Sequence, residues 1–270
     1  MVYLKAIIYG IIEGITEWLP ISSTGHLLLV EKFLALNVSS AFMEMFRIVI
    51  QLGAILAVMQ LHFNELCPWN KSNSVNERVD IFYRWKLTLL SVIPSSMVAI
   101  VLDSLCSKYL ESSIVIAFAL IAFGVIFLVL EYYYKAEDSV CEIRSMNWQQ
   151  ALGVGLFQTL SIIPGTSRSG ATMIGGMCLG LSRELSAKFS FYMAIPTMLG
   201  YSALKMVKYI LFNSFPNLKE ISLLLIAFLT AFIVSAFVVR WLTHFVSKHT
   251  FLPFAIYRIL LGTVIIISSV

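Results

Sequence analysis

Two glutamates lie four positions apart in an apolar stretch near the start of the chain. Glu13 and Glu17 should project from one side of a helix, because residues at this spacing are neighbours on a helix surface. Two carboxylates this close repel each other unless a cation or a shared proton separates them. The pair is therefore a candidate site for Mg²⁺ or Ca²⁺, hard cations that prefer oxygen ligands. The alternative is a pair satisfied by neighbouring backbone and arginine groups.

A run of hydroxyl residues follows the glutamates, at the expected start of the next helix. Ser22, Ser23 and Thr24 come directly after the Pro20 turn. Free N–H groups at a helix start can bind an anion such as phosphate, although hydroxyls there are also ordinary helix caps. His26 favours a chemical role, because it lies one turn beyond the serines and could accept a proton from one of them.

A second polar cluster lies in the other half of the chain, between Pro164 and Gly170. Its small residues allow close backbone approach, and Arg168 offers a forked cation suited to phosphate. Arg168 could instead be a structural partner of an intramembrane glutamate. Gln51 and Arg47 are further candidates for lining the same cavity, although packing roles suit them equally well. The candidate phosphate-binding residues of both clusters are Ser22, Thr24, Gly165, Ser167, Arg168, Ser169 and Thr172.

Together, these groups are typical of the hydrolysis of a phosphate ester or anhydride. A carboxylate pair would hold a metal ion, a hydroxyl would have an adjacent base, and serines with an arginine would bind the anion. Because ionisable groups at bilayer depth usually mark a site, we expect a substrate with a lipid tail. The competing class is a transporter or lipid flippase that binds an anion without hydrolysing it.

Composition places these residues in a membrane protein. Of 270 residues, 59% are hydrophobic and only 13% charged, and the mean hydropathy is +0.87. This predicts an all-α polytopic membrane protein with residues 1–270 in a single membrane-embedded domain. The net charge of +4 is spread over short loops, which argues against a nucleic-acid partner.

Apolar stretches of two lengths should position the clusters. Two pairs of shorter pieces, 3–36 and 149–181, are interrupted by Pro20 and Pro164 and predict two re-entrant helical hairpins. Non-helical backbone at this depth is tolerated only beside protein or a wet cavity, so the two turns predict a cavity. About six transmembrane helices are expected, at 41–62, 86–103, 113–134, 189–211, 221–240 and 251–270.

The order of these elements repeats along the chain. A shift of 144 positions superposes Pro20 on Pro164 and Ser23 on Ser167. Each half then has one hairpin and three crossings, and an odd number of crossings inverts one half relative to the other. The hairpins should therefore enter from opposite faces and meet near the midplane. The expected units are repeat 1 at 1–134, a polar linker at 135–148 and repeat 2 at 149–270.

Loop cations give a modest indication of orientation. Lysines and arginines are more numerous on the face that holds the loops around 63–85 and 135–148 than on the opposite face. The positive-inside rule predicts that this face is cytoplasmic. Both termini then lie outside.

The clusters closely resemble two signature motifs of a known family. EGITEWLPISSTGH (13–26) and PGTSRSGAT (164–172) are similar to those of the bacterial undecaprenyl-diphosphate phosphatase family, also called the bacitracin-resistance protein family. The resemblance extends over nearly the whole chain, through IQLGAILAV (50–58), FSFYMAIPTMLG (189–200) and FLPFAIYR (251–258). It implies an enzyme of the bacterial inner membrane that removes the terminal phosphate of a polyprenyl diphosphate lipid. The product recycles the carrier for peptidoglycan and other cell-wall polymers, and surplus enzyme confers bacitracin resistance.

The resemblance also assigns roles to particular positions. It implies a divalent cation, Mg²⁺ or Ca²⁺, at Glu13 and Glu17, with an active site that opens to the outer, periplasmic face. The catalytic residues it implies are Glu17, Ser23 as nucleophile, His26 and Arg168. We expect Ser23 to attack and His26 to take its proton, with direct attack by water as the rival. The oligomeric state stays open, a homodimer included.

Overall fold

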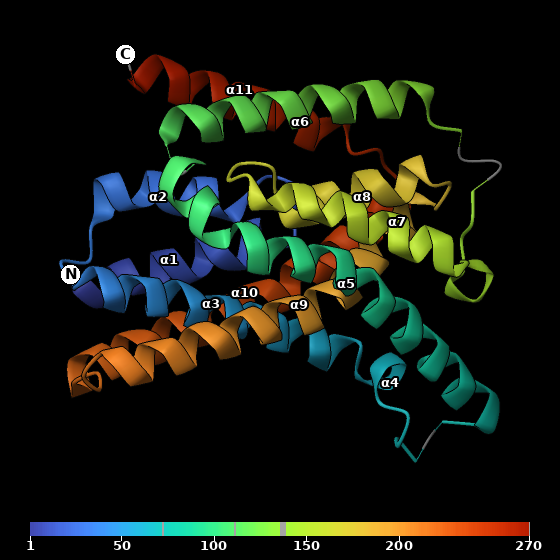
Figure 1. Cartoon of the computed structure of the whole chain (residues 1–270), viewed down its shortest axis with the longest axis horizontal. Helices are drawn as coiled ribbons and strands as arrows, with labels where there is room; N and C mark the ends of the chain where they lie inside the picture. Colours follow the sequence, from blue (N-terminus) through green and yellow to red (C-terminus); the bar gives the residue numbers. More distant parts are fainter. Residues whose placement is uncertain (72, 111, 136–138, 270) are drawn as a thin grey trace.

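The computed structural model describes residues 1–71, 73–110, 112–135 and 139–269 (Figure 1). This part of the chain is almost entirely helical, so the predicted all-α fold is confirmed. The elements in chain order are α1 (Val2–Thr16), α2 (Ser23–Leu34), α3 (Ser40–Leu61), α4 (Phe63–Leu66), α5 (Val75–Leu110), α6 (Ser113–Tyr133), η1 (Ile143–Ser145), α7 (Trp148–Thr159), η2 (Leu160–Ile162), α8 (Arg168–Cys178), α9 (Arg183–Phe212), α10 (Leu218–Val246) and α11 (Leu252–Ser269).

Among the described residues, the long helices are α3, α5, α6, α9, α10 and α11 (Figure 1). Within the described residues, α3, α5, α6 and α10 are long and apolar enough to cross a membrane. Helix α9 contains charged residues and several serines, of which Ser186, Ser190 and Ser202 are buried in the protein. Helix α11 is apolar but shorter. The protein is therefore a multi-pass membrane protein, as predicted.

Two shorter helix pairs form hairpins, α1 with α2 and α7 with α8. A side chain closes the open end of each pair. Lys5 Nζ on α1 donates to the Ala35 carbonyl beyond α2 at 2.6 Å. Gln150 Nε2 on α7 donates to the Leu179 carbonyl beyond α8 at 3.0 Å. The broken apolar stretches thus fold back on themselves, as Pro20 and Pro164 predicted.

The hairpins open toward opposite ends of the molecule. Lys32, near the end of α2, donates to Ser113 Oγ at the start of α6 at 3.2 Å. Tyr134, just beyond the end of α6, donates to the Leu181 carbonyl just after α8 at 3.0 Å. Figure 1 shows the α1–α2 pair opening on the side of the termini and the α7–α8 pair opening on the other. The two turns therefore meet between the ends, and the relation between the complete halves stays a prediction.

The stretch 63–85, predicted to be a polar loop, is largely helical. It contains α4 and the first turns of α5, which begins at Val75 instead of 86. Tyr83 Oη donates to the Met146 carbonyl at 2.7 Å, and Trp85 Nε1 donates to the Leu66 carbonyl at 2.8 Å. These tertiary partners stabilise a helical extension beyond the apolar span, which hydropathy alone does not reveal.

The predicted linker at 135–148 is only partly described, since residues 136–138 lie outside the described residues. Its described part holds η1 and a single parallel bridge between Val140 and Leu181. The bridge ties the segment before α7 to the segment after α8. It therefore fixes the outer end of the second hairpin.

One glycine lets the second hairpin lie against the long helix α5. A Cβ on Gly155 of α7 would lie 1.9 Å from the Ser91 carbonyl oxygen of α5, a separation that no real side chain allows. Only glycine permits this backbone approach. The contact positions α7, and with it the turn that carries Arg168.

Candidate active site

Each hairpin turn ends in a serine that caps the following helix. Ser22 and Ser167 both have left-handed backbone, with φ of 72° and 71°. Ser22 Oγ accepts from Gly25 N–H at 3.3 Å, and Ser167 Oγ accepts from Gly170 N–H at 3.1 Å. Both serine hydroxyls satisfy a free N–H group of a helix start. They are therefore structural equivalents.

This equivalence corrects the predicted register of the repeat at the turns. The offset is 145 (167 minus 22), not the 144 that superposed Ser23 on Ser167. The second turn has one more residue between its proline and its cap, and it includes Gly165 at φ 96°. Consequently Ser23 and Arg168 correspond, since each is the first residue of its helix.

The carboxylate of Glu17 joins the two hairpins. Arg168 Nη2 donates to Glu17 Oε1 at 2.9 Å, and Ser23 Oγ donates to Glu17 Oε2 at 2.7 Å. The Glu17 and Arg168 side chains are only 6% and 12% exposed. The two clusters, 151 residues apart in sequence, therefore meet as predicted.

Helix α9 fixes the orientation of the Arg168 guanidinium. Its Nη1 donates to the Ser190 carbonyl at 3.0 Å, and its Cζ lies 5.6 Å from the centre of the Trp18 ring. Its Nε is buried without a hydrogen-bond partner. The guanidinium thus contacts Ser190 and Trp18, and its Nε–H has no hydrogen-bond acceptor.

Two residues predicted to bind phosphate instead tie elements together. Ser169 Oγ lies 3.1 Å from both the Glu17 and the Leu19 carbonyl oxygens, so it links the two turns. Thr172 Oγ1 lies 2.7 Å from Ser190 Oγ on α9. Both side chains are buried and neither lines the cavity described next. The reason is helical geometry, because Ser169 and Thr172 lie on the face of α8 that packs on protein.

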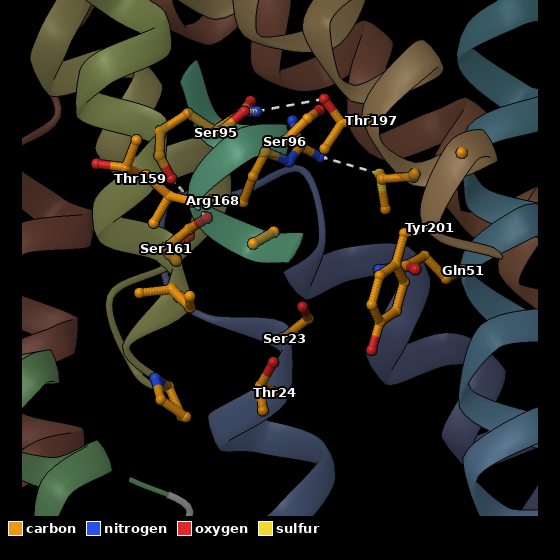
Figure 2. A pocket seen from close by; sticks show the side chains of 18 of the residues that line it. Ser23, Thr24, Gln51, Ser95, Ser96, Thr159, Ser161, Arg168, Thr197 and Tyr201 are labelled. Atoms are coloured by element: carbon orange, nitrogen blue, oxygen red, sulfur yellow. Dashed lines mark hydrogen bonds between the residues drawn. The ribbon is translucent and has the colours of Figure 1, made fainter. Parts of the chain in front are cut away.

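A cavity of about 700 Å³ lies beside the two turns (Figure 2). Figure 2 shows polar side chains from both hairpins, α5 and α9 around this space. Apolar side chains of α5 and α9 continue its wall, and Ile100 and Leu204 among them are 79% and 69% exposed. The cavity is therefore polar at the turns and apolar toward the lipid-facing surface. Predicted residues on its wall are Glu17, Ser22, Ser23, Thr24, Gln51, Gly165, Ser167 and Arg168.

Three other predicted site residues, Glu13, His26 and Arg47, lie off the cavity wall. Glu13 is only 2% exposed, and its Oε2 is buried without a hydrogen-bond partner. Arg47 hydrogen-bonds Glu31 of α2. The prediction that Arg47 lines the cavity is therefore wrong, because an acid on the neighbouring helix draws its guanidinium away.

His26 contacts Tyr257 of α11, and no hydrogen bond joins it to Ser23 among the described contacts. Its Nδ1 lies 2.7 Å from the Ser22 carbonyl oxygen, which can only accept, so we assign the ring proton to Nδ1. Its Nε2 lies 2.6 Å from Tyr257 Oη, and the two rings are stacked at an interplanar angle of 5°. The acceptor of the Ser23 hydroxyl is therefore Glu17 and not His26.

Sequence reasoning missed Arg258 of α11 as a site residue. This arginine is fully buried, and it donates to the carbonyls of Pro20, Gly165 and Thr166 at 2.9 Å each. A lone cation within the apolar stretch 251–270 was a signal that could have found it. It contacts both hairpin turns.

The acidic pair could supply only part of a metal site. Within the described residues, no group of three or more His, Cys, Asp or Glu side chains is arranged to hold a metal ion. Glu13 Oε2, buried without a donor, and the neighbouring Glu17 carboxylate could nevertheless each offer one oxygen to a cation. Such a pair fits Mg²⁺, which commonly takes one or two carboxylates and completes its shell with water and substrate phosphate.

Comparison with known proteins identifies the family. Residues 6–264 match the family described as bacitracin resistance protein BacA. The chain is 47% identical over 267 residues to a protein named undecaprenyl-diphosphatase from Streptococcus suis (strain 05ZYH33), covering 98% of this chain and 96% of the relative. Proteins of the same name from Streptococcus pyogenes serotype M12 (strain MGAS2096) and serotype M1 share the same identity and coverage. The chain therefore belongs to the bacitracin resistance protein BacA family.

Proposed function

We propose that this protein hydrolyses undecaprenyl diphosphate to undecaprenyl phosphate and inorganic phosphate. The family and the name shared by relatives at 47% identity support this substrate. The single observation that carries the proposal is the Glu17 carboxylate, bonded at once to the Ser23 hydroxyl and the Arg168 guanidinium on a cavity wall. This activity returns the lipid carrier to cell-wall synthesis and confers bacitracin resistance.

The shape of the cavity supports a substrate with a charged head and a long apolar tail. The head would lie at the polar end, between the starts of α2 and α8. The tail would leave between α5 and α9, past Ile100 and Leu204, which the surrounding lipid can reach. An isoprenoid chain needs no polar partner along that path.

Ser23 is the nucleophile that the geometry supports. Its hydroxyl proton already points to Glu17 Oε2 at 2.7 Å, within the range for proton transfer to a general base. Ser23 Oγ would form a bond to the terminal phosphorus while the bond from that phosphorus to the bridging oxygen breaks. Undecaprenyl phosphate leaves, and water then hydrolyses the phosphoserine to inorganic phosphate and free Ser23.

Arg168 couples substrate binding to the strength of this base. Its guanidinium spans Glu17 and the Ser190 carbonyl and holds Nε without a partner. A bound phosphate would draw donors from Glu17, which would leave the carboxylate better able to accept the Ser23 proton. The guanidinium would also stabilise charge on the transferred phosphoryl group.

His26 would act at a later stage or by the rival route. With Nδ1–H bonded to the Ser22 carbonyl, Nε2 is the basic nitrogen, and it lies against Tyr257. Direct attack by water with His26 as base would require Nε2 to leave Tyr257. A Ser23→Ala variant without activity supports Ser23 as nucleophile, whereas retained activity supports the water route.

Glu13 and Glu17 would hold the divalent cation, Mg²⁺ or Ca²⁺, that we propose as cofactor. The Glu13 oxygen without a donor supports this assignment. When bound, the ion would neutralise charge on the diphosphate. The contacts of Ser23 and Arg168 with Glu17 are hydrogen bonds between protein groups and do not include the cation.

We propose that the site faces the periplasm across the bacterial inner membrane. The cavity residues of α5, from Ser95 to Ile100, belong to the half of that helix that leads toward the termini. Loop cations are more numerous at the opposite end, which the positive-inside rule makes cytoplasmic. A cavity in the half near the termini would therefore face outward.

Phosphate release from a polyprenyl diphosphate tests the function. Purified full-length protein in detergent should release phosphate from undecaprenyl or farnesyl diphosphate, and Arg168→Ala should lower the rate by at least about a hundredfold. The comparison variant is Arg183→Ala, which removes an arginine paired with Glu131 away from the cavity. Parent protein that moves the lipid across a vesicle membrane but releases no phosphate would favour the transporter class instead.

A further inference from the structure

Arg258 lies at the junction of the two hairpin turns. It is completely buried on α11. Nη1 donates to the Pro20 carbonyl of the first turn at 2.9 Å. Nη2 donates to the Gly165 and Thr166 carbonyls of the second turn, also at 2.9 Å. One planar group therefore spans two segments that are far apart in the sequence.

These carbonyls need a donor because of where they lie. Backbone that leaves the helical path at membrane depth exposes C=O groups that water cannot reach, and each one costs free energy if it stays unsatisfied. A guanidinium has five N–H donors in a fixed fork. Arg258 uses four of them, because Nε also approaches the Leu120 carbonyl of α6 at 3.4 Å.

Pairing with an acid does not explain this arginine. Among the described residues, no aspartate or glutamate forms an ion pair with Arg258, whereas Arg168 and Arg183 each pair with a glutamate. A buried charge without a counter-charge is costly. The partners of the Arg258 guanidinium are therefore the turn carbonyls. The hydrogen bonds to these carbonyls offset the free-energy cost of burying its charge.

The carbonyls that Arg258 holds lie next to the reacting groups. Pro20 is three residues from both Glu17 and Ser23, and Thr166 is two residues before Arg168. The Ser169 hydroxyl, against the Glu17 and Leu19 carbonyls, makes a further side-chain link between the turns, beside the Glu17–Arg168 contact itself. A shift of one turn against the other would therefore change the Glu17–Arg168 contact directly.

We propose that Arg258 is a positioning residue for the phosphatase reaction. It sets the separation of the two turns, and thereby the geometry of Ser23, Glu17 and Arg168, without touching the substrate. This inference rests on the proposed function. Misplacement of reacting groups by about 1 Å can cost on the order of a hundredfold in rate, so its loss should appear in kcat.

The first test compares Arg258→Lys with Arg183→Lys in full-length protein in detergent. A lysine keeps the charge but loses the fork that reaches three carbonyls at once. We expect kcat to fall by about a hundredfold while KM changes less than about threefold, because the apolar walls that would hold the tail are intact. The Arg183→Lys protein, changed at a partly buried arginine that pairs with Glu131, should keep a kcat within about twofold of the parent.

A second variant tests the same link without removing the arginine. A Cβ on Gly170 would lie 3.1 Å from Arg258 Nη1 and 3.3 Å from the Ser167 Cβ, so Gly170→Ala should push the guanidinium and the Ser167 cap by a few tenths of an ångström. We expect it to lower kcat severalfold in protein that melts at the parent temperature. This variant also serves if Arg258→Lys fails to fold.

A double-mutant cycle separates positioning from a general loss of stability. If Arg258 and Ser169 hold the same pair of turns, the combined Arg258→Lys and Ser169→Ala loss in kcat should be clearly smaller than the product of the single losses. Independent, multiplying effects would overturn the inference. So would folded Arg258→Lys, or folded Gly170→Ala, with the parent kcat.

The parent protein distinguishes failure of this inference from failure of the proposed function. Parent that releases phosphate while Arg258→Lys does so equally fast leaves the function standing and removes the positioning role. Parent that releases no phosphate contradicts the function itself, and the inference falls with it.

Discussion

Replacing Glu17 by glutamine should abolish most phosphatase activity while leaving the protein folded. The change is nearly isosteric, but it removes the charge that Arg168 Nη2 contacts at 2.9 Å and the base that Ser23 Oγ contacts at 2.7 Å. Loss of a general base alone costs about 10² to 10⁴ in rate. We therefore expect kcat to fall by about 10³, equivalent to roughly 4 kcal/mol of transition-state stabilisation.

The effect of Glu17→Gln on the free energy of unfolding should be smaller than its effect on activity, because two compensations oppose the loss of the ion pair. Removing one partner of a buried ion pair can cost about 3–5 kcal/mol. However, the glutamine carbonyl keeps one acceptor for Arg168 or Ser23, and the loss of one charge relieves the repulsion between Glu13 and Glu17. Because these contributions oppose each other, the melting temperature should change little in comparison with the activity.

The assay measures phosphate release from farnesyl diphosphate together with thermal unfolding in the same detergent. The matched control is Glu44→Gln, which makes the same chemical change at a 59% exposed side chain whose contact with Lys205 is 2.8 Å. An exposed pair of this kind contributes about 0–1 kcal/mol, so the control should retain parent activity. A Glu17→Gln protein with more than about a tenth of the parent kcat would refute the assignment of Glu17 as base.

Two further predictions concern the cation and the distant end of the protein. Chelation with EDTA should stop phosphate release, and added Mg²⁺ or Ca²⁺ should restore it. The Glu13→Gln variant should need at least about tenfold more cation than the parent for half-maximal activity. An equal cation requirement in parent and variant would contradict a ligand role for Glu13. The Glu65 carboxylate accepts hydrogen bonds from His62, which has the largest effect, and from Tyr192. These bonds lower its pKa from 4.5 to about 2. Since the folded-state pKa is depressed, this stabilisation is complete above about pH 4.5 and is lost as the pH falls toward 2. The melting temperature of the parent should therefore drop toward that of Glu65→Gln across this window, and a constant difference between them would contradict the prediction.

Local sequence predicted the elements of the fold better than the directions of individual side chains. The helices at 113–134 and 41–62 were recovered within a residue or two as α6 and α3, because their apolar stretches end in serines or polar loops. The start of α5 was misjudged because tertiary contacts, such as that of Tyr83 with Met146, stabilise a polar helical segment. Hydropathy measures affinity for lipid, and it does not register such partners.

Within the candidate site, sequence predicted which residues meet but not what each one contacts. The meeting of Glu17 with Arg168 followed from two polar clusters that must share one cavity. Ser23 contacts Glu17, and His26 contacts Tyr257. Both directions depend on the left-handed backbone at Ser22. Residue spacing along an ideal helix cannot predict this change of backbone conformation. Spacing fixes angular position on a helix, whereas hydrogen bonds decide where a side chain points.

The opposed hairpins have a consequence for the order in which the protein can be made. The first hairpin carries Glu17 into the membrane when Arg168, its partner 151 residues later, has not yet been synthesised. At roughly 5–20 residues per second, the gap lasts about 8–30 s. During that time Glu17 lacks the guanidinium of Arg168, and Arg258, which bonds both turns, emerges later still. The contact between Glu17 and Arg168 that joins the two turns can therefore form only late in synthesis, after the second hairpin has been made.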